Sequence, residues 1–285
     1  MFTIAYLNGA YLSLDEAKIS VTDSGFLYGF GCYETLRGYR GRVFRLNEHL
    51  IRLSQTAEHL KLPVDIQELK IIITEILLRN DYENVRLRIT ITGGKTNQLM
   101  GGNAILSPTI LVTAVKYIPY STDIYEKGFN VIIASMSRSS LSSLSEMKTI
   151  CFLESLLVRE EAYSAGADDA IFLNEKGFLA EASSSNVFLV SGGFLKTPRL
   201  GSGLLPGVTR EVVLELAKKY GLSTMETDIK LEELQAAEEV FITNSMIEIM
   251  PVSKVESKII SSGRPGPITL KLSDIYKDLV DKEAC

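Results

Sequence analysis

The sequence of 285 residues predicts an α+β fold that is divided into two domains. Strand-like and helix-like segments mix along the chain without the regular alternation that a doubly wound parallel sheet requires. Residues 116–123, Lys-Tyr-Ile-Pro-Tyr-Ser-Thr-Asp, place proline and polar side chains after a completed strand pattern. We therefore expect a small N-terminal domain at residues 1–117, a linker at 118–123 and a larger C-terminal domain at 124–285. The length of the chain by itself fits either one large domain or two small ones.

The N-terminal part alternates short strands with two helices. Clusters of β-branched and aromatic residues predict strands at residues 4–7, 32–39, 85–92 and 109–115. Apolar residues at helical spacing predict one helix over about 47–60, which Asn47 can cap, and a second over about 66–79.

The C-terminal part continues the mixture. Strands are expected at residues 129–134, 169–173, 186–190, 194–197 and 240–243. Helices are expected at 151–165, 209–220 and 270–281, and Gly166 and Gly221 stand where the first two of these should end.

Composition excludes several classes of function. The net charge of −5 and the isoelectric point near 5.3 argue against a general nucleic-acid-binding surface, which would be basic. No apolar stretch is long enough to span a bilayer, and the N-terminal residues lack a basic start followed by an apolar run. We expect no membrane segment and no cleaved signal.

The cysteines and histidines predict neither a disulfide framework nor a metal site. The three cysteines, Cys32, Cys151 and Cys285, are too widely spaced for metal ligation and fit a reduced, cytoplasmic compartment. His49 and His59 fall on one predicted helix but on different faces of it.

Three features in a fixed order carry the candidate chemistry: Lys148, Glu181 and the run Leu-Leu-Pro-Gly-Val-Thr-Arg at 204–210. A pyridoxal 5'-phosphate site needs three parts: an amine that forms an imine, an acid that keeps the ring nitrogen protonated, and a helix start that binds phosphate. Each has an ordinary alternative, since most lysines and carboxylates are solvated and most helix starts are simple caps. The ordered set is more specific than its members.

These residues and their neighbours resemble the fold-type IV pyridoxal phosphate enzymes, in several motifs spread nearly end to end. The family contains branched-chain aminotransferases, D-amino acid aminotransferases and 4-amino-4-deoxychorismate lyases. The matching motifs are Tyr-Gly-Phe-Gly-Cys-Tyr-Glu-Thr-Leu-Arg at 28–37, Asn-Glu-His-Leu-Ile-Arg-Leu at 47–53, Met-Lys-Thr at 147–149, Glu-Ala-Ser-Ser-Ser-Asn-Val-Phe at 181–188, residues 204–210, and Thr-Asn-Ser-Met-Ile-Glu-Ile-Met-Pro-Val at 243–252.

The resemblance implies a small N-terminal α/β domain, a larger C-terminal domain with a mixed, barrel-like sheet, and a homodimer with its site between the domains. It implies that Lys148 forms a Schiff base with the cofactor and moves the proton, and that Glu181 pairs with the ring nitrogen. The implied phosphate ligands and ring support are Arg52, Val208, Thr209, Ser245 and Leu205. The implied substrate-facing residues are Tyr33, Thr35, Arg88, Ser185 and Met246.

By this resemblance the chain is a transaminase that moves an amino group between a small amino acid, of branched-chain or D-amino acid type, and a 2-oxo acid. The alternative is 4-amino-4-deoxychorismate lyase, because branched-chain enzymes usually carry glycine where this chain has Thr35, whereas the lyases carry threonine. Residues 181–186, in contrast, are most similar to D-amino acid aminotransferases. A third possibility, from another class, is an inactive binding protein on the same scaffold.

Overall fold

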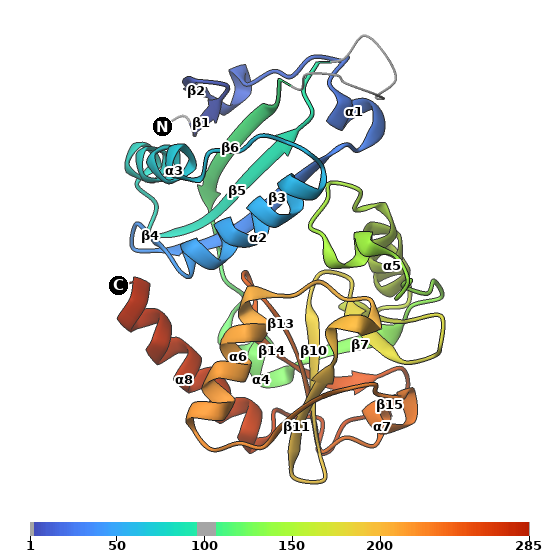
Figure 1. Ribbon diagram of the computed structural model, residues 1–285. Helices are drawn as coiled ribbons and strands as arrows, with labels where there is room; N and C mark the ends of the chain where they lie inside the picture. The colour runs from blue at the N-terminus through green and yellow to red at the C-terminus, as the bar shows by residue number, and fades with distance from the viewer. Residues whose placement is uncertain (1–2, 96–106, 285) are drawn as a thin grey trace. The chain divides into compact units, whose positions relative to one another are not determined.

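A computed structural model describes residues 3–95 and 107–284 and separates the chain into two compact units (Figure 1). Unit 1 comprises Met1–Ile118, Met147–Cys151 and Lys282–Cys285, and unit 2 comprises Pro119–Glu146 and Phe152–Asp281. The short segment Met147–Cys151, which contains Lys148, therefore groups with the N-terminal unit although the chain around it belongs to unit 2.

Unit 1 is an antiparallel six-stranded sheet in the order β2-β1-β6-β5-β3-β4, with two long helices. Its strands are β1 Ile4–Leu7, β2 Ala10–Ser13, β3 Gly31–Tyr39, β4 Arg42–Val43, β5 Asn84–Thr92 and β6 Thr109–Lys116. Its helices are η1 Leu14–Glu16, α1 Ser24–Tyr28, α2 Leu46–His59 and α3 Ile66–Asn80.

The two faces of β3 and β5 have different partners. Leu36 and Leu87, which are register partners, belong to the apolar core with buried residues of α2 and α3. Successive side chains of a strand point to opposite faces, so Tyr33, Thr35 and Arg88 lie on the face away from that core. The sheet thereby places the predicted substrate-facing residues of this unit together on one surface.

Unit 2 is built on a mixed nine-stranded sheet, ordered β12-β11-β10-β13-β14-β7-β8-β9, with β15 pairing to β14. The strands are β7 Phe129–Ile133, β8 Asp169–Leu173, β9 Leu179–Ala182, β10 Asn186–Ser191, β11 Phe194–Pro198, β12 Thr224–Thr227, β13 Glu239–Asn244, β14 Glu248–Val255 and β15 Lys258–Ile259. The helices are α4 Thr122–Lys127, η2 Ser143–Glu146, α5 Leu153–Ser164, η3 Leu200–Ser202, α6 Val208–Lys219, α7 Leu231–Gln235 and α8 Pro267–Ala284.

This sheet curls, so that its last strand returns towards its middle. β9 is terminal in the pairing order, yet it also contacts β10 and β11, and β11 stands near the other end of that order. The predicted mixed, barrel-like sheet is confirmed. The curl matters for function because it brings the β9–β10 turn close to the start of α6.

Most predicted elements are present, with boundaries that shift by one or two residues, but one predicted cap is wrong and some elements were not predicted. Asn47 is not the cap of α2, because the helix begins at Leu46 and the capping position is Arg45, in the left-handed region at φ 53°. β14 is among the elements that were not predicted, and it contains Pro251 although proline is usually confined to edge strands or bulges. In the structure Pro251 is the register partner of Phe241.

Within the described residues, no helix is both long enough and apolar enough to cross a bilayer.

Candidate active site

The backbone of Lys148 and its neighbours is hydrogen-bonded to β3 and α2 of unit 1. Tyr33 N donates to Lys148 O at 3.0 Å, and Ile150 N donates to Gly31 O at 3.0 Å. Because β5 pairs with the whole of β3 along one edge, this segment lies on the other edge. Lys148 N also donates to Thr56 Oγ1 of α2 at 3.4 Å. These contacts fix the position from which the lysine side chain starts.

The side chain of Lys148 shares an aromatic ring with Arg88. Lys148 Nζ lies 4.8 Å and Arg88 Cζ lies 4.0 Å from the centroid of the Tyr33 ring. Thr35 is the register partner of Arg88 across the β3–β5 pair. Burial lowers the pKa of Arg88, and the nearby Tyr33 hydroxyl opposes part of this decrease. The structure thus brings together four of the predicted site residues, with two cations at one tyrosine ring.

Arg52, the predicted phosphate ligand of unit 1, is bound to a buried carboxylate. Arg52 Nε donates to Glu34 Oε1 at 2.7 Å and Nη2 donates to Oε2 at 2.9 Å, while His49 Nδ1 lies 2.8 Å from the same Oε2. Burial alone would raise the pKa of Glu34, but Arg52 and His49 hold it well below its usual value. Glu34 therefore orients the guanidinium and compensates much of its charge.

Glu34 and His49 were not among the predicted site residues. A signal was present in the strand pattern, because Glu34 alternates with Cys32 and Leu36 on the face that packs into the core. A carboxylate at such a position requires a partner. His49 and Arg52 stand three residues apart on α2 and therefore on one face of that helix.

Glu181 of β9 is a buried residue whose two carboxylate oxygens each have a donor. Leu205 N donates to Oε2 at 3.0 Å, and Arg138 Nη2 donates to Oε1 at 3.1 Å. Leu205, the predicted support of the ring, and Glu181, the predicted acid, are therefore in direct contact, although they are 24 residues apart in the sequence. Arg138 did not appear among the predicted site residues.

The start of α6 has the features of an anion site. Val208 and Thr209 are its first two residues, and the capping residue, Gly207, precedes them in an extended conformation and has no side chain with which to cap this end. The first backbone N–H groups of a helix lack partners within the helix and attract anions. Asn186 Nδ2 donates to Leu205 O at 2.9 Å, and a Cβ on residue 207 would lie 2.0 Å from Asn186 Oδ1. A larger residue at position 207 would therefore displace the Asn186 amide.

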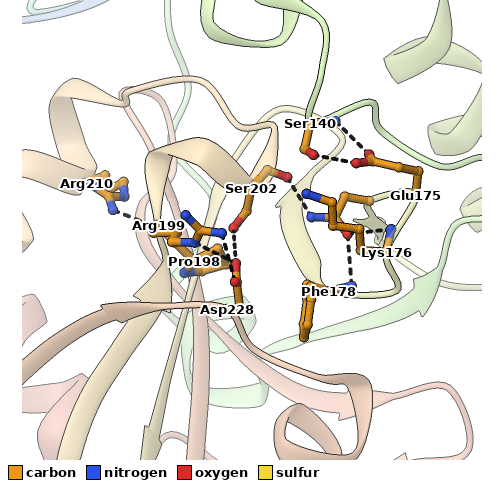
Figure 2. A network of polar contacts seen from close by, with 10 residues as sticks. Ser140, Glu175, Lys176, Phe178, Pro198, Arg199, Ser202, Arg210 and Asp228 are labelled. Carbon is orange, nitrogen blue, oxygen red and sulfur yellow. Dashed lines mark hydrogen bonds and ion pairs between the residues drawn. The ribbon is translucent and has the colours of Figure 1, made fainter.

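A polar network fixes the loop that leads into α6 (Figure 2). Arg199 donates to Asp228 through Nε at 2.8 Å and Nη2 at 2.9 Å, and Ser202 Oγ donates to the same carboxylate at 3.0 Å. The Arg199 guanidinium lowers the pKa of Asp228. Asn174 Nδ2 donates to Ser202 O at 3.2 Å. The loop is thus held from two sides just before Leu205.

Ser185 and Met246 both contact the side-chain amide of Asn244. Asn244 Nδ2 donates to Ser185 Oγ at 2.9 Å, while Asn244 Oδ1 accepts from Met246 N at 2.8 Å and from Ile247 N at 3.0 Å. The amide therefore shapes the turn between β13 and β14 that carries Ser245. It also ties this turn to the β9–β10 turn, which follows Glu181.

The residues present fit pyridoxal phosphate. The group needs an amine for its aldehyde, an anionic partner for its ring nitrogen and donors for its phosphate. Lys148 supplies an amine, Glu181 supplies a buried carboxylate whose oxygens are already oriented, and α6 supplies a helix start whose capping residue is glycine. Thr209, which is buried, adds a hydroxyl at that start.

Comparison with known proteins decides the family. The model of class IV amino-transferases matches residues 31–255. A putative branched-chain-amino-acid aminotransferase of Methanocaldococcus jannaschii is 35% identical over 97% of this chain and 96% of that protein. The aminodeoxychorismate lyase of Bacillus subtilis is 32% identical, over 95% and 93%.

The chain belongs to the class IV aminotransferases. A solved branched-chain amino acid aminotransferase of Thermobaculum terrenum, in its PLP-bound holo form, superimposes on this class IV protein with a TM-score of 0.89. The two are 27% identical, and the match covers 99% of this chain and 95% of the other. The predicted fold, enzyme class and cofactor are confirmed: this class IV aminotransferase is a pyridoxal phosphate-dependent transaminase.

Proposed function

We propose that this aminotransferase transfers an amino group between a branched-chain amino acid and a 2-oxo acid. The observation that carries the proposal is the cluster of Lys148, Tyr33 and Arg88, which combines an amine, an aromatic wall and a guanidinium suited to a carboxylate. Both substrates carry a carboxylate beside the reacting carbon. The names of the M. jannaschii and T. terrenum relatives support the branched-chain class.

Each predicted site residue has a place in this proposal. Pyridoxal phosphate supplies an electrophilic carbon and an electron-withdrawing ring. Lys148 Nζ would hold the cofactor covalently, and its amine would move the proton of the substrate carbon. Glu181 would pair with the ring nitrogen, and Leu205 would lie against the ring. The first N–H groups of α6, at Val208 and Thr209, would bind the phosphate, and Arg52 and Ser245 are the other proposed phosphate ligands.

The substrate side is formed by the remaining residues. Arg88 binds the carboxylate, and Tyr33 and Met246 present apolar surface to the side chain. Thr35 and Ser185 provide hydroxyl groups on the substrate side. Met246 is partly buried against the core of unit 2, which makes its thioether a well-supported apolar wall.

A substrate panel tests the proposal. Purified enzyme is supplied with L- and D-amino acids, with 2-oxoglutarate or pyruvate as acceptor, and new amino acid and oxo acid are both measured. We expect the highest kcat/KM for L-leucine, L-isoleucine and L-valine. Lys148→Ala is the matched control for activity of contaminating enzymes. Turnover of D-alanine above that of every branched-chain substrate would reject the branched-chain assignment.

The second candidate is the lyase that releases pyruvate from 4-amino-4-deoxychorismate. Thr35, opposite Arg88 on the predicted substrate face, favours it, as does the similarity to the B. subtilis lyase. The same panel therefore includes aminodeoxychorismate, with pyruvate release as the readout. Pyruvate release faster than any transamination would replace the first candidate by this one.

We further propose that the protein is a cytoplasmic homodimer that binds neither nucleic acid nor membranes. Leucines on one face of α5, Leu153, Leu156 and Leu157, are each at least half exposed. An exposed apolar face of this kind is typical of a protein interface. Cys32 and Cys151 are free thiols, as expected in a reducing compartment. Light scattering of the purified protein tests the dimer: a monomer mass at micromolar concentration would contradict it.

A further inference from the structure

Arg138 forms an ion pair with Glu181, the proposed partner of the ring nitrogen. Its Nη2 donates to Glu181 Oε1 at 3.1 Å, and both side chains are largely buried, with 15% and 10% of their surface exposed. A buried carboxylate beside a buried guanidinium is stabilised as an anion, whereas either group alone would carry an uncompensated charge.

Arg138 is itself held in place from several sides. Its backbone N donates to Leu173 O at 2.8 Å, and its guanidinium lies 4.3 Å from the centroid of the Phe172 ring. Nη2 also donates to Ser155 Oγ at 3.2 Å, and Nη1 lies 3.2 Å from Glu154 Oε2. The guanidinium therefore has little freedom to follow a displaced Glu181, and it imposes its own position on the carboxylate.

We propose that Arg138 is a positioning residue that holds Glu181 ionised and oriented for the ring nitrogen of the cofactor. Leu205 N–H holds the other oxygen, so the two donors together fix the plane of the carboxylate. The inference rests on the role of Glu181 proposed above, and it assigns to Arg138 an effect on cofactor binding that acts only through that carboxylate.

A purely structural role for Arg138 would be to attach the first turn of α5 through Glu154 and Ser155. The two roles have different dependence on Glu181. A structural role weakens the protein equally whether or not Glu181 is charged. A positioning role disappears when residue 181 no longer carries a carboxylate, which a double-mutant cycle measures.

The experiment measures the dissociation constant of pyridoxal phosphate from the apoenzyme and the melting temperature of the apoenzyme. The variants are Arg138→Leu, Arg138→Lys, Glu181→Gln and the double variant Arg138→Leu/Glu181→Gln. Glu154→Gln is the matched control, because it removes the other ion pair of Arg138 at a side chain that is 57% exposed.

We expect Arg138→Leu to weaken cofactor binding roughly ten-fold or more in the wild-type background, as for loss of a charged hydrogen bond, and less than about two-fold in the Glu181→Gln background. Arg138→Lys should recover part of the loss, since it restores a charged donor. Glu154→Gln should leave the constant unchanged.

Equal losses in both backgrounds, or a loss reproduced by Glu154→Gln, would overturn the proposal for Arg138. If Arg138→Leu fails to fold, Arg138→Lys in the two backgrounds completes the cycle with the same criterion. The role of Glu181 is tested separately, because Glu181→Gln alone should weaken binding. If that variant binds the cofactor normally, the proposed function of Glu181 is wrong and the inference about Arg138 fails with it.

Discussion

Lys148 and Tyr33 are joined at two levels: Tyr33 N donates to Lys148 O at 3.0 Å, and Lys148 Nζ lies 4.8 Å from the centroid of the Tyr33 ring. The first contact sets the backbone from which the lysine extends, and the second guides its amine. Because Tyr33 is part of β3, which pairs with β5 along its whole length, the amine is positioned by a strand that is itself fixed within the sheet of unit 1.

Replacing Lys148 by alanine should abolish transamination without unfolding the protein. The amine is lost, but the backbone contacts of residue 148 with Tyr33 and Thr56 remain. We expect kcat to fall by about three orders of magnitude or more. The visible absorption band of covalently held cofactor should disappear while the melting temperature of the apoenzyme changes little. Near-normal turnover would remove Lys148 from the mechanism.

Glu181→Gln should slow turnover while retaining the fold. A neutral amide cannot stabilise a protonated ring nitrogen, and it exchanges the charged contact with Arg138 for a neutral one. A lost charged hydrogen bond corresponds to roughly 1.5–3 kcal/mol, or about one to two powers of ten in rate. Steady-state kcat and cofactor affinity are the measurements. Glu181→Asp should reduce kcat less than Glu181→Gln only if the shorter carboxylate still reaches the ring nitrogen. Unchanged kcat and cofactor affinity for Glu181→Gln would show that another residue is the acid.

Thr35→Gly should separate the two candidate reactions. In a lyase, the hydroxyl takes part in the reaction, so the variant should lose pyruvate release from aminodeoxychorismate and keep or increase transamination. In a transaminase, glycine mainly widens the site and shifts preference to bulkier side chains, with about 0.5–1 kcal/mol lost in stability. The ratio of the two activities in wild type and variant is the readout. A constant ratio would show that Thr35 does not select the reaction.

His49 should make folding stability depend on pH. Burial lowers its pKa from the ordinary 6.5, with Arg52 and Lys148 acting in the same direction against Glu34. The unfolded chain therefore takes up a proton below pH 6.5 that the folded protein does not, so stability falls as pH decreases from 6.5 towards the folded-state pKa. At pH 5.5 this loss reaches at most about 1.4 kcal/mol.

The measurement is the free energy of unfolding in urea between pH 7.5 and 5.5 for wild type, His49→Gln and His59→Gln. His49→Gln should show a smaller decrease with falling pH than wild type, whatever its absolute stability. His59 lies on the same helix but is exposed, so His59→Gln should keep the wild-type dependence. Parallel pH profiles for wild type and His49→Gln would contradict the buried, neutral state of His49.

Local pattern was sufficient for much of this protein. The β-branched and aromatic composition of β3 and β5, and the helical spacing of apolar residues in α3 and α6, predicted these elements nearly to their ends, because both signals arise within a single element. The start of α6, with glycine before Val208 and Thr209, is likewise a local feature. The order of Lys148, Glu181 and this helix start indicated the cofactor from the sequence alone.

The partners of these residues were decided only by the tertiary structure. Lys148 N meets a hydroxyl 92 residues away, and Arg138 meets a carboxylate 43 residues away. Strand alternation shows that Glu34 points into the core, but it does not show which helix supplies the arginine that compensates it. Periodicity specifies a face of an element, whereas a hydrogen bond requires two particular atoms within about 3 Å, and only the packing of distant segments determines that.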